Sequence, residues 1–137
     1  MHEECSSIVE STGAKARLRR IVERRLAPGA DKARIDQEIW DTFGAEKTVM
    51  FTDLVGFSRR VAEFGIIHFL QVILESERLF SDCISEWEGT LLKREGDSML
   101  LVFDRPEQAV HCAVAMQRVA RDYNVNLDDA EKVLLCV

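Results

Sequence analysis

Apolar residues recur along the chain with two spacings, and each spacing predicts a different kind of element. Near the N-terminus they fall every three or four positions, which predicts two amphipathic helices, Ala14–Ala27 and Asp31–Phe43, separated by Pro28-Gly29. The second helix is expected to bury four residues: Ile35, Ile39, Trp40 and Phe43. Residues 1–12 are polar with little periodicity, so they are predicted to form a polar tail that frays.

Beyond these helices, short apolar runs alternate with longer helical stripes. The pattern predicts a strand ending at Asp53, a short helix (Ser58–Phe64), a long helix, a two-stranded hairpin, another helix and a last strand over residues 132–137. The long helix is expected to place these residues on one apolar stripe: Ile66, Phe69, Leu70, Ile73, Phe80, Ile84 and Trp87. The order β-α-α-β-β-α-β predicts an α/β (α+β) fold, a ferredoxin-like split βαβ sandwich preceded by two N-terminal helices. We expect three regions: a tail (1–12), a helical linker (13–44) and one further domain (45–137).

Composition limits the class of protein. Of 137 residues, 47% are hydrophobic and 31% are charged, which is typical of a globular domain. The net charge of −6 argues against a nucleic-acid partner, because little basic surface is left to neutralise phosphates. No apolar run reaches the roughly 20 residues that a transmembrane segment needs, and the acidic, polar start is unlike a secretory signal.

The four cysteines are scattered along the chain and form no C-x-x-C pair: Cys5, Cys83, Cys112 and Cys136. This spacing favours reduced thiols and hence a cytoplasmic protein, with the last three cysteines expected in the core. The first predicted helix also carries a basic face. Such a face is usually solvated, although contact with acidic lipid or with a partner stays open.

The segment Val49–Ser58 ends an apolar strand on a carboxylate and a glycine. Asp53 would lie where the strand leaves the core, Gly56 would allow a tight turn, and Ser58 could cap the following helix. Because free amides at a helix start attract anions, the segment is consistent with a site for metal-bound phosphates. Taken alone, it is equally consistent with a buried strand that leads into an ordinary helix.

The segment Leu91–Phe103 reads as two strands joined by a charged turn, with Gly96 at a position that favours positive φ. Asp97 opens the second of these strands. If that strand lies antiparallel beside the strand ending at Asp53, both carboxylates converge at one edge of the sheet. Two neighbouring carboxylates repel each other unless cations bind, and hard cations such as Mg²⁺ or Mn²⁺ prefer oxygen ligands.

With both segments in view, the chain from about Glu46 onward resembles the class III adenylate/guanylate cyclase catalytic domain. The residues that carry the likeness are Phe51-Thr52-Asp53-Leu54-Val55-Gly56-Phe57-Ser58 and Lys93-Arg94-Glu95-Gly96-Asp97. The resemblance implies a catalytic site with two Mg²⁺ or Mn²⁺ ions, bound by Asp53, Asp97 and the backbone carbonyl of Leu54. It also implies that the turn Val55-Gly56-Phe57-Ser58 cradles the triphosphate.

By the same resemblance, Lys93 lies at the position that selects the purine. Adenine N1 accepts a hydrogen bond and can pair with an ammonium group, whereas guanine N1 carries a hydrogen and would pair with a carboxylate. Lys93 therefore favours ATP. The alternative is that this lysine is only a solvated charge at a hairpin.

Members of the family build each site from two subunits, so the resemblance implies a homodimer, or a heterodimer with another cyclase domain. They also carry a transition-state asparagine and arginine beyond the strand at which this sequence ends. Four candidate residues occur here, but none sits at a matching position: Asn124, Asn126, Arg118 and Arg121.

Three functions are therefore considered. The first is an adenylate cyclase, a lyase that converts ATP to 3′,5′-cyclic AMP and pyrophosphate by a two-metal mechanism in cyclic-nucleotide signalling. The second is a catalytically inactive pseudo-cyclase that binds nucleotide or dimerises. A palm-like polymerase or diguanylate cyclase is disfavoured, because the hairpin lacks a Gly-Gly-acidic sequence.

Overall fold

The computed structural model describes the backbone of residues 2–137 and the side chains of residues 13–56 and 58–137. The chain divides into two units, Met1–Glu46 and Lys47–Val137. No helix in the described part of the chain is both long enough and apolar enough to cross a bilayer.

The first unit consists of two helices, α1 (His2–Leu26) and α2 (Lys32–Phe43). Helix α1 begins at His2, so the backbone is helical where the sequence predicted a frayed tail. The side chain of Asp31 caps α2 by accepting from the backbone N–H of Arg34 at 3.2 Å. Ion pairs join the two helices, Arg24 to Glu38 at 2.6 Å and Arg25 to Asp36 at 2.5 Å.

The prediction that α2 buries four apolar residues was wrong for Trp40, which is 69% exposed, while Ile35, Ile39 and Phe43 are only half-buried. Within this unit α2 has a single helix to pack against. A two-helix hairpin can cover only a narrow stripe of each member, and Ile21 is the one buried apolar side chain among the unit's described side chains.

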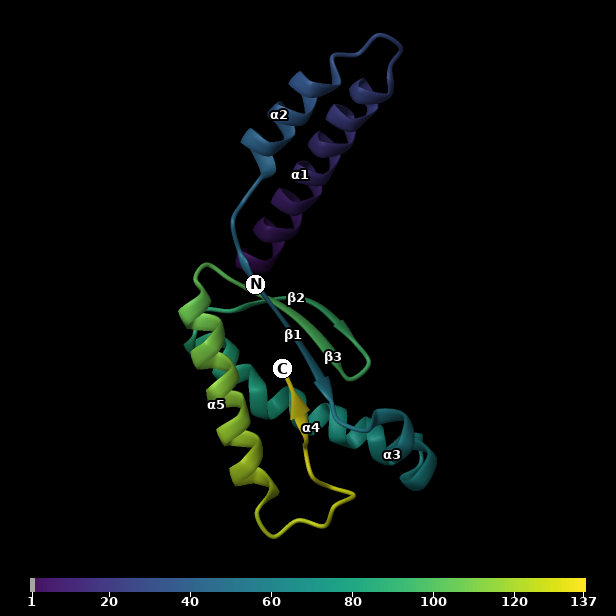
Figure 1. The fold of residues 1–137 in the computed structure, drawn as a ribbon, viewed down its shortest axis with the longest axis vertical. Helices are drawn as coiled ribbons and strands as arrows, with labels where there is room; N and C mark the ends of the chain where they lie inside the picture. Colours follow the sequence, from purple (N-terminus) through teal and green to yellow (C-terminus); the bar gives the residue numbers. More distant parts are fainter. Residues whose placement is uncertain (1) are drawn as a thin grey trace. The chain divides into compact units, whose positions relative to one another are not determined.

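The second unit is a four-stranded sheet with three helices (Figure 1). Its elements are, in order, β1 (Thr48–Leu54), α3 (Phe57–Phe64), α4 (Ile66–Glu86), β2 (Thr90–Glu95), β3 (Ser98–Phe103), α5 (Pro106–Asn124) and β4 (Leu135–Cys136). The strand order is β2-β3-β1-β4, and every neighbouring pair is antiparallel. The predicted ferredoxin-like split βαβ fold is confirmed.

One face of the sheet packs on helices α4 and α5. Along β1 and β3 the buried residues alternate with more exposed ones, as period-two packing requires. Phe69, Phe80, Leu101, Phe103 and Met116 are among the most deeply buried side chains of this core.

Three predictions about burial in this unit were wrong. Ile66 and Leu70 lie largely exposed on the outer side of α4, because the helix turns Phe69 and Val72 toward the core instead. Cys136 is exposed on the edge strand, whereas Cys83 and Cys112 are buried as expected.

The opposite face of the sheet is open. Val49 and Phe51 are exposed on β1, and the register places Phe51 opposite Leu100 of β3, which in turn lies opposite Lys93 of β2. An irregularity in β2 between Leu91 and Lys93 changes the side of the sheet toward which the strand's residues point. Asp53 therefore shares its open face with an apolar row and with Lys93.

Candidate functional site

Asp53 lies on β1, one residue before the strand ends at Leu54. The two residues fall on opposite faces of the sheet: the Leu54 side chain is buried in the core, and the Asp53 side chain is on the open face. The edge strand β4 supports this end of β1, since Asp53 pairs with Cys136 and Leu54 with Leu135. On its other side β1 pairs with β3 only as far as Thr52, so β4 is the strand that holds the backbone at Asp53 itself.

Asp97 lies in the two-residue turn between β2 and β3, directly before β3 rather than inside it as predicted. Gly96, the other turn residue, has φ = +60°, as the sequence indicated. The hairpin projects this turn to the same end of the sheet at which β1 finishes, because β1 and β3 run antiparallel.

The two carboxylates meet at a single backbone amide. The N–H of Leu54 donates to Asp53 Oδ1 at 2.9 Å and to Asp97 Oδ2 at 3.3 Å, and Ser98 Oγ donates to Asp53 Oδ1 at 3.4 Å. Burial, followed by the hydrogen bond and the charge of the neighbouring Asp53 carboxyl, raises the pKa of Asp97 above its ordinary value of 3.8. The structure brings together the two residues that the sequence singled out; their role as metal ligands stays a prediction.

This arrangement fits a hard divalent cation. A cation between the carboxylates would offset the burial and the Asp53 charge that raise the pKa of Asp97, and both side chains offer only oxygen. Among the described residues there is no cluster of three or more acidic, histidine or cysteine ligands. The remaining ligands would have to be carbonyl, water or substrate oxygens, as is usual for Mg²⁺ at phosphate sites.

The predicted triphosphate turn follows directly. Val55 and Gly56 form a turn in which Gly56 has φ = +72°, and α3 begins at Phe57. Gly56, not Ser58, occupies the N-cap position, and no side chain caps the helix, so the prediction that Ser58 caps α3 was wrong. Uncapped amides of the first helical turn remain available to an anion.

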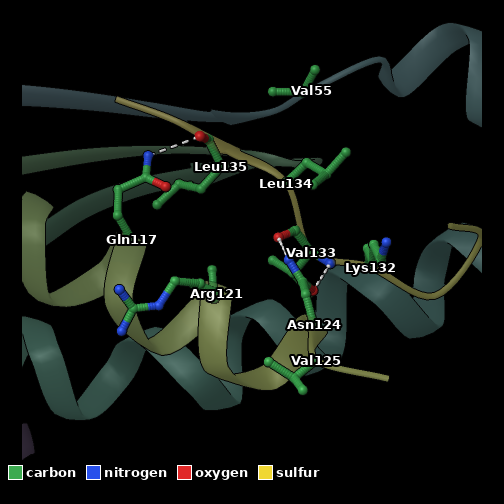
Figure 2. A pocket seen from close by; sticks show the side chains of 10 residues that line it. Val55, Gln117, Arg121, Asn124, Val125, Lys132, Val133, Leu134 and Leu135 are labelled. Atoms are coloured by element: carbon green, nitrogen blue, oxygen red, sulfur yellow. Dashed lines mark hydrogen bonds between the residues drawn. The ribbon is translucent and has the colours of Figure 1, made fainter. Parts of the chain in front are cut away.

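Helix α5 fixes the edge strand that supports the site. Figure 2 shows Asn124 bonded to both backbone groups of Val133, with its Oδ1 accepting from the N–H at 2.7 Å and its Nδ2 donating to the C=O at 2.7 Å. Gln117 Nε2 donates to the Leu135 carbonyl at 2.9 Å. These bonds take Val133 out of the ladder, which is why β4 is shorter than the predicted strand over 132–137.

The space seen in Figure 2 is a pocket of about 630 Å³ between α5 and β4. Among the predicted site residues whose side chains are described, Val55 alone lines it, and neither aspartate does. We therefore regard it as part of the support for β4 rather than as the reaction site.

Lys93 lies on β2 on the open face of the sheet. Its ammonium is largely exposed and lies 3.4 Å from the carboxylate of Glu95. An exposed ion pair of this kind contributes little to stability, so Lys93 can exchange Glu95 for another acceptor at small cost.

Two arginines next to the turn were not anticipated from the sequence. Arg59 is exposed, whereas Arg60 is only 6% exposed and donates to the backbone carbonyls of Asp129 and Ala130 at 2.6 and 2.8 Å. Their position shortly after Gly56 could have drawn attention to them in the sequence. Only the fold shows that Arg60 is buried and Arg59 is exposed.

Comparison with known proteins gives few sequence relatives. No family model matches the chain. A segment of 86 residues, 63% of this chain, is 28% identical to "Serine/threonine-protein kinase pkn2" of Myxococcus xanthus and spans 10% of that protein. This share of the kinase is too small to carry its activity to the present chain.

Similar solved structures are nucleotide cyclases. The guanylyl cyclase Cya2 aligns over 59% of this chain and 46% of its own, with a TM-score of 0.52 and 24% identity. A bacterial light-regulated adenylyl cyclase aligns over 66% and 50%, with a TM-score of 0.61 and 14% identity. Another structure of a bacterial light-regulated adenylyl cyclase aligns over 98% of this chain and 42% of its own, at a TM-score of 0.55 and 15% identity.

The chain thus spans half or less of each of these structures. These structures agree with the fold predicted from the order of the elements, and in this chain that fold brings the two carboxylates together at the end of β1. The chain contains a domain with the class III nucleotide cyclase fold.

Proposed function

We propose that this domain binds a purine nucleoside triphosphate together with divalent cations and belongs to an adenylate cyclase that forms 3′,5′-cyclic AMP and pyrophosphate. The observation that carries the proposal is the convergence of Asp53 and Asp97 on the Leu54 amide. A solvated surface pair would have no reason to share one donor at the end of a central strand, where burial and the Asp53 carboxyl raise the pKa of Asp97.

In this proposal Asp53, Asp97 and the Leu54 carbonyl hold Mg²⁺ or Mn²⁺. The bound ions supply Lewis-acid activation of the ribose 3′-hydroxyl and neutralise charge on the phosphates. The turn Val55–Ser58 receives the triphosphate at the amides of α3, and its φ-positive glycine allows the phosphates to approach the backbone closely.

Lys93 selects adenine by donating to N1. We propose that the lysine acts on the nucleotide held by the aspartates of a second subunit, so that the working unit is a homodimer or a heterodimer with another cyclase domain. The exposed apolar row beside Asp53 on the open sheet face supports such an association.

The test is calorimetric titration of the chain with ATP in the presence of Mn²⁺. We expect saturable, Mn²⁺-dependent binding that Asp53→Asn abolishes while the circular dichroism spectrum stays unchanged. Binding that is insensitive to Asp53→Asn would refute the proposal.

Turnover is tested separately by measuring cyclic AMP, with Asp97→Ala as the control. Production that is lost in Asp97→Ala would establish the cyclase. Because no residue of this chain matches the family's transition-state asparagine and arginine, Mn²⁺-dependent ATP binding without cyclic AMP would establish a nucleotide-binding module, either a pseudo-cyclase or the binding part of a cyclase.

A further inference from the structure

Arg59 is placed to act on whatever the Gly56 turn binds. It lies in the first turn of α3, and a Cβ atom at Gly56 would lie 4.0 Å from Nη2 of Arg59. The guanidinium makes no hydrogen bond or ion pair with any side chain or backbone group of the described residues. Its donors are therefore available beside the turn.

Arg59 lines a cavity of about 440 Å³ that adjoins the turn at Val55. It is lined by Val55, Arg59, Arg60, Glu63, Phe64, Asp129 and Leu134. The lining carries two arginines and two carboxylates, and Lys132 lies beside it, 3.0 Å from Asp129, so three cationic side chains stand against two carboxylates. The balance of charge in this cavity favours an anion.

Arg60 adds a second, independent indication. Its side chain is 6% exposed, yet its partners are the carbonyl oxygens of Asp129 and Ala130 rather than a carboxylate. A buried guanidinium that no described carboxylate neutralises is costly and raises the local positive potential. Its own amide donates to the Gly56 carbonyl at 2.9 Å, which fixes the backbone of Arg60 next to the turn, while the two loop carbonyls hold its guanidinium.

We infer that Arg59 contacts the terminal phosphates of the bound nucleoside triphosphate, with Arg60 as a positioning residue that holds the turn; this rests on the proposed function. The carboxylates at the end of β1 then face the metal-bound side of the triphosphate, and Arg59 faces its other side across Gly56. A guanidinium fork matches two phosphate oxygens, which an ammonium cannot do.

The experiment compares Mn²⁺-dependent binding of ATP and of AMP by calorimetry in the full chain, its Arg59→Gln and Arg59→Lys variants, and the control Arg118→Gln. Arg118 is also exposed, but it lies on α5 away from the turn. We expect Arg59→Gln to weaken ATP binding about tenfold, the order of one lost charged hydrogen bond, and to change AMP binding less than twofold. Arg59→Lys should fall between the two, and Arg118→Gln should match the unmodified chain.

Unchanged ATP affinity in Arg59→Gln, or equal losses for ATP and AMP, would overturn this inference while leaving the proposed function in place. Absence of Mn²⁺-dependent ATP binding by the unmodified chain would overturn the proposed function and this inference with it.

Discussion

At the scale of single residues, the feature that matters most is one amide shared by two carboxylates. The Leu54 N–H can offset only part of the effect of burial and of the neighbouring Asp53 carboxyl on Asp97, so the metal-free site carries a local energetic cost. Such a cost is typical of binding sites, where the ligand rather than the fold completes the interaction.

The first prediction concerns that cost. The pKa of Asp97 is raised in the folded state, so folding favours the protonated carboxyl. The stability that Asp97 contributes is therefore fully present below its ordinary pKa of 3.8 and is lost as pH rises through the raised pKa. In EDTA, Asp97→Asn should therefore unfold at a higher temperature than the unmodified chain at pH 7, and the difference should vanish at low pH. Added Mn²⁺ should stabilise only the unmodified chain.

A second prediction concerns base selection. Lys93→Glu places a carboxylate where adenine offers an acceptor, so the ratio of ATP to GTP affinity should fall by about tenfold or more, the cost of one unpaired polar group of 1–3 kcal/mol. Competition between the two nucleotides measures the ratio. An unchanged ratio would mean that Lys93 is only a surface charge, and Arg118→Glu controls for the change in net charge.

A third prediction concerns the thiols. Burial raises the pKa of Cys112 to about 11 and also raises that of Cys83, whereas Cys136 is exposed. In a Cys5→Ser background, iodoacetamide at pH 8 should modify Cys136 first, and the other two only after unfolding. Mass spectrometry of native and urea-treated samples distinguishes the three sites.

At the scale of elements, α5 does more than cover the sheet. Its last residue, Asn124, holds Val133, and the short strand that follows supports Asp53 and Leu54. The site is therefore coupled to α5 through these two hydrogen bonds, a third from Gln117 to the Leu135 carbonyl, and a two-residue strand.

The fourth prediction tests this coupling. Asn124→Ala removes both bonds to Val133 and should cost about 1–3 kcal/mol in the free energy of unfolding. Amide exchange should also accelerate at Val133 and Val55, whose N–H donates to the Leu134 carbonyl. Asn126→Gly is the matched control, since Asn126 has φ = +66° and glycine tolerates that conformation. Loss of stability without faster exchange at Val55 would disprove the coupling.

At the scale of the whole molecule, helices α4 and α5 cover one face of the sheet and leave its other face open. Phe51 is 68% exposed and Val49 is 53% exposed on that open face. Apolar side chains gathered on one sheet face beside a candidate site favour association with another surface.

The fifth prediction follows from this exposure. The isolated chain should self-associate, and Phe51→Ser should weaken the association roughly tenfold, as expected from removing one large buried apolar side chain. Sedimentation velocity at several concentrations measures the effect. Leu74→Ser, which changes an equally exposed residue on α4, should leave it unchanged.

The sequence by itself determined the order of the elements, the fold class and the carboxylate pair. These depend on local periodicity, on Gly96 and Gly56 at positions of positive φ, and on strand pairing that brings Asp53 to the hairpin turn. Such features are encoded within a few residues or follow from topology.

Only the tertiary structure decided which apolar and charged side chains are covered. Trp40 and Cys136 were expected inside and lie outside, because their elements have too few neighbours to bury them. Arg59 and Arg60 are adjacent and chemically identical, yet the fold buries one against the carbonyls of a distant loop and leaves the other beside the turn. Burial depends on what packs against a residue from elsewhere in the chain, and a local pattern does not contain that information.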